Sequence, residues 1–154
     1  VPIYPKARHI IQESCWNEAI SPNERYQSSF YEDDFLPLEE KGLIDMIDGD
    51  SEIAPGVTLK VANGPSRGHQ MVLVDTGSER VVFAGDLIPT PHHLQPNFIA
   101  ATDEFPNDTL VQKKELLEMA MKDGWIIVFG HGQENRSGYV EEWNGKPHLL
   151  PKEV

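Results

Sequence analysis

Cysteine is nearly missing from this 154-residue sequence, which has Cys15 alone. A single cysteine cannot form a disulfide within the chain, and it cannot build a thiolate-rich metal site. Cys15 lies beside Trp16 in an apolar segment, so we expect a buried structural thiol rather than a nucleophile. The low cysteine content fits a reducing compartment, and the expected location is cytoplasmic.

Long hydrophobic runs and clusters of basic residues are also missing. The longest uninterrupted apolar stretch, residues 125–129, is far shorter than the roughly 18 residues of a membrane-spanning helix. The 13 basic residues are scattered among 25 acidic ones, which gives a net charge of -12. Lys113 and Lys114 are adjacent, but we expect them on the solvated face of a helix. The sequence therefore predicts neither a membrane partner nor a nucleic-acid partner.

A signal peptide and an activated serine are missing as well. The first residues, Val1 to Pro5, lead directly into a strand-like segment, which suggests a piece of a longer protein. Ser66 and Ser78 lie in turn-rich loops without the nucleophile-elbow pattern, so nucleophilic catalysis is disfavoured.

The apolar residues that are present follow a mixed α/β pattern. Strands are predicted at residues 8–12, 43–47, 57–61, 71–74, 81–84 and 125–129. Helices are predicted at residues 13–20, 36–41 and 110–122, the last capped by Asp108 or Thr109 and the last two stopped by Gly42 and Gly124. Residues 23–34 are expected to form an irregular cover, and Asn144-Gly145 predicts a closing hairpin over residues 139–150.

Two predicted strands end in the same way. One runs into Gly85-Asp86 and the other into Gly130-His131. Sites in layered α/β proteins form beyond the carboxyl ends of strands, and Asp and His are suitable ligands for zinc. Because metal–ligand bonds are near 2 Å, a shared ion requires Asp86 and His131 to lie within about 6 Å of each other. The alternative is that Asp86 caps a loop and His131 is an ordinary histidine at a strand end.

Three motifs taken together resemble the metallo-β-lactamase superfamily, in its lactonase-like and organophosphate-hydrolase-like branch. They are Gly-Pro-Ser-Arg-Gly-His-Gln at residues 64–70, Ala-Gly-Asp-Leu-Ile-Pro-Thr at 84–90 and Phe-Gly-His-Gly at 129–132. The resemblance extends over almost the whole chain. It implies a four-layer αββα sandwich in which residues 1–154 are the C-terminal portion of a single domain. It also implies one or two divalent ions, which would be zinc, iron or manganese.

The resemblance assigns roles to four residues. Asp86 matches the bridging aspartate, which would also orient the reacting water, and His131 matches the last histidine ligand of the second metal. His69 matches a histidine that lies beside the site without binding metal. His93 follows the aspartate motif, where this branch often has a histidine, so it is a candidate catalytic or substrate-pocket residue. Plain loop structure is the alternative for His93.

The sequence departs from the family pattern in two places. Pro65 occupies the position of a ligand histidine, four residues before His69, and it has no lone pair to offer a metal. The His-x-His-x-Asp-His motif is absent, and His92-His93 has the wrong spacing to replace it. We therefore expect an N-terminal half of the same domain, as a second chain or a missing segment, to supply the other ligands and to cover an apolar sheet face.

Two functional hypotheses follow. The first is a hydrolase that uses a metal-activated water on a small lactone, ester or phosphoester. The second is a degenerate family member, weakly active or inactive, that serves as a binding or assembly module, and Pro65 is the evidence for it. A redox enzyme on the same fold is disfavoured, because the sequence shows neither the additional acidic ligands nor a flavin domain. A homodimer is left open.

Overall fold

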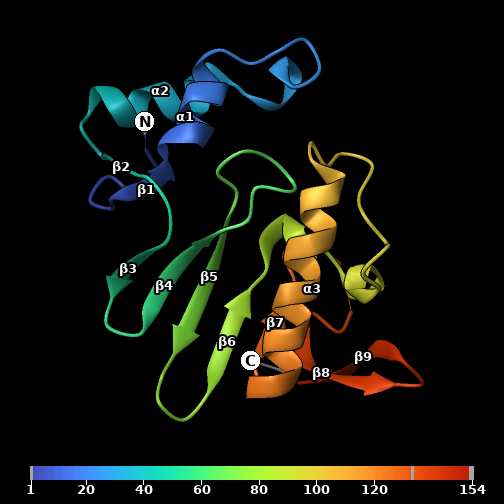
Figure 1. Ribbon diagram of the computed structural model, residues 1–154. Helices are drawn as coiled ribbons and strands as arrows, with labels where there is room; N and C mark the ends of the chain where they lie inside the picture. The colour runs from blue at the N-terminus through green and yellow to red at the C-terminus, as the bar shows by residue number, and fades with distance from the viewer. Residues whose placement is uncertain (1, 133, 153–154) are drawn as a thin grey trace. The chain divides into compact units, whose positions relative to one another are not determined.

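The computed structural model describes residues 2–132 and 134–152 (Figure 1). The chain divides into two compact units, Val1–Gly49 and Asp50–Val154. Each unit has its own sheet, of two and seven strands respectively. Within the described ranges, none of the helices combines the length and the apolar character that crossing a membrane requires.

The first unit is a pair of parallel strands connected through two helices. Its elements in chain order are β1 (His9–Gln12), α1 (Glu13–Ile20), the 3-10 helix η1 (Gln27–Ser29), α2 (Glu32–Glu40) and β2 (Ile44–Ile47). The Gln12 side chain is only 2% exposed. Its Nε2 donates to the Gly49 carbonyl at 2.9 Å, and the Gly49 N–H donates to its Oε1 at 2.8 Å. These two hydrogen bonds connect the end of β1 to the end of the unit.

The sequence predicts the start of this unit better than its middle. Helix α1 has the predicted bounds, and Gly42 has the left-handed φ of 63° expected after α2. Helix α2 begins at Glu32 rather than at residue 36, so the prediction of irregular structure up to residue 34 is wrong. The first turn of α2 is acidic, which favours a helix N-terminus electrostatically but gives no apolar periodicity to detect.

The second unit is a seven-stranded sheet with one long helix. Its elements in chain order are β3 (Ser51–Ala54), β4 (Val57–Val61), β5 (Gln70–Asp75), β6 (Arg80–Phe83), η2 (Gly85–Leu87), η3 (Pro91–Leu94), α3 (Pro106–Asp123), β7 (Ile126–Val128), β8 (Ser137–Trp143) and β9 (Lys146–Pro151). The strands follow one another in chain order across the sheet. Neighbours are antiparallel except β6 and β7, because α3 lies in the connection between them (Figure 1).

The closing hairpin is confirmed and one edge strand was missed. Asn144 and Gly145 both have positive φ, 51° and 73°, as a type I′ turn requires. Strand β3 is absent from the predicted elements because three of its four residues are exposed, so its sequence shows no apolar alternation.

Helix α3 is longer than predicted, and the predicted cap is wrong. The helix begins at Pro106, whose fixed φ suits the first helical position. Thr109 therefore lies inside the helix, fully buried, and its hydroxyl donates to the Asp103 carboxylate at 2.6 Å. Gly124 ends the helix with a left-handed φ of 69°, as predicted.

The two faces of the larger sheet differ in burial. Val82 and Ile127 pack with Leu116, Leu117 and Ala120 of α3 in the hydrophobic core. On the opposite face, the strand register places Val72, Phe83 and Val128 in one row. Val72 and Val128 are only partly buried, and Phe83 is 42% exposed.

We predict that Gly64→Ala destabilises the second unit by about 2–4 kcal/mol. A Cβ at Gly64 would lie 2.3–2.5 Å from the hydroxyl, the amide nitrogen and the Cα of Thr109, so α3 or the loop must move. Gly77→Ala is the control, because its Cβ meets no atom within 4 Å; only its left-handed backbone adds a cost, of about 1 kcal/mol. Urea denaturation measures both. Equal destabilisation in the two variants contradicts the close packing at Gly64.

Candidate metal centre

The candidate centre begins where β6 and β7 end. The two strands are parallel neighbours, with Phe83 opposite Val128. The Ala84 N–H donates to the Val128 carbonyl at 3.1 Å, which extends the pairing beyond β6. The residues that follow both strands therefore emerge at the same edge of the sheet.

Asp86 and His131 reach a common point there. The distance between Asp86 Oδ1 and His131 Nε2 is 3.0 Å, which confirms the predicted juxtaposition. Both side chains remain open to solvent, with 59% and 66% of their surfaces exposed. Their role as metal ligands remains a prediction.

His69 fixes the backbone of Asp86 rather than its carboxylate. The Asp86 N–H donates to His69 Nε2 at 2.9 Å. Burial lowers the pKa of His69, although the nearby Asp86 charge acts in the opposite direction. A neutral imidazole is the form that can accept this hydrogen bond. His69 thus positions the start of the loop that carries the Asp86 carboxylate.

Gly85 makes this approach of His69 possible. A Cβ at Gly85 would lie 2.5 Å from His69 Nε2, and its φ of 55° is left-handed. No larger residue satisfies both requirements. The glycine before Asp86 in the sequence is therefore explained by the histidine packed against it.

The backbone of His131 is also held. Its N–H donates to the Pro89 carbonyl at 2.9 Å. A Cβ added at Gly132 would reach ordinary van der Waals distance, 3.9 Å, from side-chain atoms of Thr90 and Pro91, so the loop after β7 passes close to the loop after β6. The loop after β6 and the loop after β7 therefore support each other.

His93 is tied to its own loop. Its Nδ1 is 2.8 Å from the Thr90 hydroxyl. Burial lowers the pKa of His93, and the positive charge of Lys113 lowers it further. These interactions account for its position without bringing it into hydrogen-bond contact with Asp86 or His131, so its catalytic role remains a prediction. His92 is exposed.

Pro65 is buried and takes part in backbone packing. Its carbonyl accepts a hydrogen bond from the Glu104 N–H at 3.0 Å, and the carbonyl of Gly64 accepts one from the Phe105 N–H at 2.9 Å. The loop that ends in His69 is therefore fastened to the start of α3. The Pro65 ring offers no metal donor at the position where the family pattern has a histidine.

The donors present fit part of a metal site. A tetrahedral ion with bonds of about 2.0–2.2 Å separates its ligand atoms by about 3.3–3.6 Å, close to the 3.0 Å between Asp86 Oδ1 and His131 Nε2. Carboxylate oxygen and imidazole nitrogen are both suitable for zinc. However, the described part of the chain contains no group of three His, Cys, Asp or Glu that could hold an ion. The fit is to two ligands, one fewer than catalytic zinc usually has.

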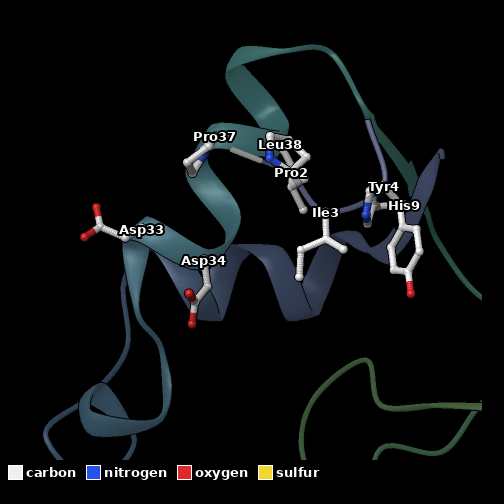
Figure 2. A pocket seen from close by; sticks show the side chains of 8 residues that line it. All are labelled: Pro2, Ile3, Tyr4, His9, Asp33, Asp34, Pro37 and Leu38. Carbon is white, nitrogen blue, oxygen red and sulfur yellow. The ribbon is translucent and has the colours of Figure 1, made fainter. Parts of the chain in front are cut away.

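The first unit has a cavity of its own, of about 400 Å³ (Figure 2). In this view Ile3, Pro2 and Leu38 lie together, while the Asp33 carboxylate points away from them. His9 lies beside Tyr4, well away from Asp33 (Figure 2). The polar groups of this cavity therefore do not converge on one point.

The prediction that Lys113 and Lys114 are both solvated is correct for one of them and wrong for the other. Lys114 is exposed, but Lys113 is fully buried. The buried positions of α3 are Thr109, Lys113, Leu116, Leu117 and Ala120. This spacing of three and four residues places Lys113 on the inward face of the helix. The periodicity was therefore the signal that could have revealed it.

The thiol of Cys15 is partly buried, and burial raises its pKa. A raised pKa keeps the side chain in its protonated form, which is the unreactive one. Reactivity at Cys15 is thus disfavoured, in agreement with a structural role.

We predict that His69 titration makes the protein less stable in mild acid. Because burial lowers the pKa of His69 in the folded state, the unfolded chain binds more protons below about pH 6.5, and the free energy of unfolding falls as pH decreases through that range. His69→Gln keeps an acceptor for the Asp86 N–H without this titration, so it should lose less stability between about pH 6.5 and 5. Urea denaturation at several pH values measures the difference.

His148→Gln is the matched control, because His148 is an exposed histidine on β9. Its stability should follow the wild-type pH profile. Parallel profiles for wild type and His69→Gln would exclude His69 as the responsible group.

Curated relatives of this chain are lactonases. An N-acyl homoserine lactonase from Bacillus cereus is 32% identical over 121 residues, which cover 74% of this chain and 44% of the relative. A second, from Bacillus sp, is 29% identical over 136 residues, covering 88% of this chain and 46% of the relative. The chain thus spans about half the length of the curated relatives it matches.

Solved structures of hydrolases share the mixed α/β fold of this chain. A probable metal-dependent hydrolase from Staphylococcus aureus matches 99% of this chain and 55% of its own with a TM-score of 0.84 at 23% identity. An N-acyl homoserine lactone hydrolase, solved with N-hexanoyl-L-homoserine at its catalytic metal centre, matches 79% of this chain and 46% of its own with a TM-score of 0.65 at 28% identity. The family model for the metallo-beta-lactamase superfamily matches residues 3–131. The chain belongs to the metallo-beta-lactamase superfamily.

Proposed function

We propose that this chain is the C-terminal portion of a metal-dependent hydrolase whose ion is held in part by Asp86 and His131. The observation that carries the proposal is the 3.0 Å approach of Asp86 Oδ1 to His131 Nε2 at the ends of two parallel strands. The remaining ligands come from an N-terminal half of the domain. That half also covers the sheet face on which Phe83 is 42% exposed.

The proposed substrate is a small lactone, of which an N-acyl homoserine lactone is the first to test. Two curated relatives and one solved structure at 28% identity are lactonases by name. Hydrolysis of a lactone adds water to the ring carbonyl and breaks the ring C–O bond, which gives one open-chain product with a carboxylate at one end and an alcohol at the other, and releases a proton. Simple esters and phosphoesters are the other substrates to compare.

We assign each site residue of this chain a separate role in the hydrolysis. When bound, a zinc, iron or manganese ion lowers the pKa of its water and polarises the scissile carbonyl. Asp86 would hold the ion and orient the reacting water through its exposed carboxylate, and His131 would hold the ion through Nε2. His69 keeps Asp86 in place through the backbone hydrogen bond at 2.9 Å. His93 contributes to the substrate pocket and is aligned by Thr90.

A second function is a binding or assembly module that has lost catalysis. The observation that favours it is Pro65, buried and bound through its backbone carbonyl at the position of a family ligand. Metal content and a substitution at Pro65 separate the two functions.

We predict that the full-length protein, grown with zinc, iron and manganese, binds at least about one equivalent of metal. His131→Gln should reduce the content at least about tenfold, because it removes one of few ligands. His148→Gln, on an exposed histidine of β9, should keep the wild-type content. The measurement is elemental analysis of the purified proteins. Less than about half an equivalent in the wild type would defeat the hydrolase proposal.

We predict that the wild type already hydrolyses the lactone and that Pro65→His changes its kcat/KM less than about tenfold. Pro65→Ala is the control, because it removes the proline ring without adding a ligand. Kinetics and metal analysis are measured on all three proteins. An inactive wild type that gains both metal and activity with Pro65→His, but not with Pro65→Ala, would instead support the degenerate module.

A further inference from the structure

A buried lysine forms hydrogen bonds to the last residues of the stretch 86–98, which starts at Asp86. Lys113 on α3 has no exposed surface. Its Nζ donates to the Phe98 carbonyl at 2.5 Å and lies 3.5 Å from the Gln95 carbonyl. Both acceptors belong to the stretch that follows η3, so the ammonium group binds loop backbone rather than core side chains.

Lys113 lies in a polar cluster inside an apolar core. Thr109, one helical turn earlier, is also fully buried, and its hydroxyl donates to Asp103 Oδ2 at 2.6 Å. Asp103 is only 6% exposed. Burial lowers the pKa of Lys113 to about 8, and the Asp103 carboxylate counteracts part of this shift.

Residues 86–98 are held at both ends. At the beginning, the Asp86 N–H is bound to His69, and the Pro89 carbonyl accepts the His131 N–H at 2.9 Å. At the far end, Lys113 binds two carbonyls. Between them the stretch has only the short helices η2 and η3 and no strand pairing. Leu87, Ile88 and Leu94 anchor the stretch in the hydrophobic core, and Gln95 Nε2 donates to the Pro147 carbonyl at 3.1 Å. Lys113 adds the backbone attachment of its last residues, 95–98.

We infer that Lys113 is a positioning residue, which holds residues 95–98 and thereby sets the place of His93 on the substrate side of the candidate centre. The inference rests on the proposed hydrolase function. It assigns Lys113 no contact with substrate or metal. Its effect passes through the loop, from the bound carbonyls at 95 and 98 to His93 on η3.

The chemistry of the position supports this role over simple core filling. A methionine or leucine would fill the same space without the cost of removing an ammonium group from water. A buried charge is tolerated when hydrogen bonds compensate it, and here the compensating groups are loop carbonyls. The cation thus gives a directional attachment that an apolar side chain does not provide.

The experiment compares Lys113→Met with Lys114→Met in the full-length protein. Lys114 is the adjacent, exposed lysine of the same helix, so its replacement removes the same charge without touching the loop. The direct measurement is hydrogen–deuterium exchange of the His93, Phe98 and Asp103 amides, which donate at 2.9, 2.9 and 3.1 Å within the loop. We expect exchange at least about tenfold faster in Lys113→Met and wild-type exchange in Lys114→Met.

Two further measurements distinguish positioning from general damage. Metal content should stay at the wild-type level in Lys113→Met. With an N-acyl homoserine lactone as substrate, KM should rise more than about fivefold while kcat stays within about threefold. Lys113→Arg retains the cation and its donors and should return loop exchange toward the wild-type rate. If Lys113→Met does not fold, Lys113→Gln, which is neutral and shorter, takes its place in the comparison with Lys114→Met.

Equal exchange of residues 93–103 in the neutral Lys113 variant and in Lys114→Met would overturn the inference. So would a loss of metal, or a fall in kcat with unchanged KM. Failure of the proposed function is visible separately, as a wild-type protein without metal and without hydrolysis. In that case the exchange experiment still decides whether Lys113 holds the loop.

Discussion

The pairing of two strands that run in the same direction is the constraint on which the candidate centre depends. Every other pair in the larger sheet is antiparallel, so consecutive strands elsewhere end at opposite edges. Among neighbouring strands of this sheet, β6 and β7 deliver the residues after them to one edge. Strand β4, which runs parallel to β6 on the other side of β5, ends at the same edge and leads to His69. This arrangement needs a crossover, and α3 supplies it by packing on the sheet through Leu116, Leu117 and Ala120. The crossover from β6 to β7 thus has two results: it packs α3 on the sheet, and it brings Asp86 close to His131.

Helix α3 also organises the loops around the centre. Its first turns contact the loop that ends in His69, at the close approach of Gly64 to Thr109. One turn later, Lys113 binds the stretch that follows η3. The first of these loops contacts Asp86 through the His69 ring, whose Nε2 accepts a hydrogen bond from the Asp86 N–H. The second is part of the same continuous stretch of chain that begins at Asp86. A single rigid element therefore fixes the relative position of groups that are far apart in the sequence.

Sequence patterns predicted the parts of the structure that follow local rules. The alternation in β4 and β5, the turn at Asn144-Gly145 and the stop at Gly124 each have a local cause, and each is confirmed. The glycines before Asp86 and His131 marked the two strand ends correctly. Motif resemblance, rather than periodicity, identified the family.

The errors arose where tertiary contacts outweigh local preference. Thr109 is a good capping residue by type, yet the buried Asp103 carboxylate binds its hydroxyl inside the helix. The periodicity of α3 indicated an inward position for Lys113, but its charge favoured solvent. Its partners, the backbone carbonyls of Gln95 and Phe98, are 18 and 15 residues away, and no local pattern reveals them. The exposed edge strand β3 shows no alternation because only its pairing with β4 makes it a strand.

In Asp86 and His131, the groups that fix the position of the residue are different from the groups that would bind an ion. Both residues are fixed through their backbone N–H groups, by the His69 ring and the Pro89 carbonyl, and neither attachment involves the carboxylate or the imidazole itself. In the proposed metal centre, exchanging either side chain for a softer or harder donor would alter which ion is preferred while the backbone path stays the same. If the proposed ion binds here, its identity would be open to change by single substitutions at the strand ends, without rebuilding the sheet beneath them.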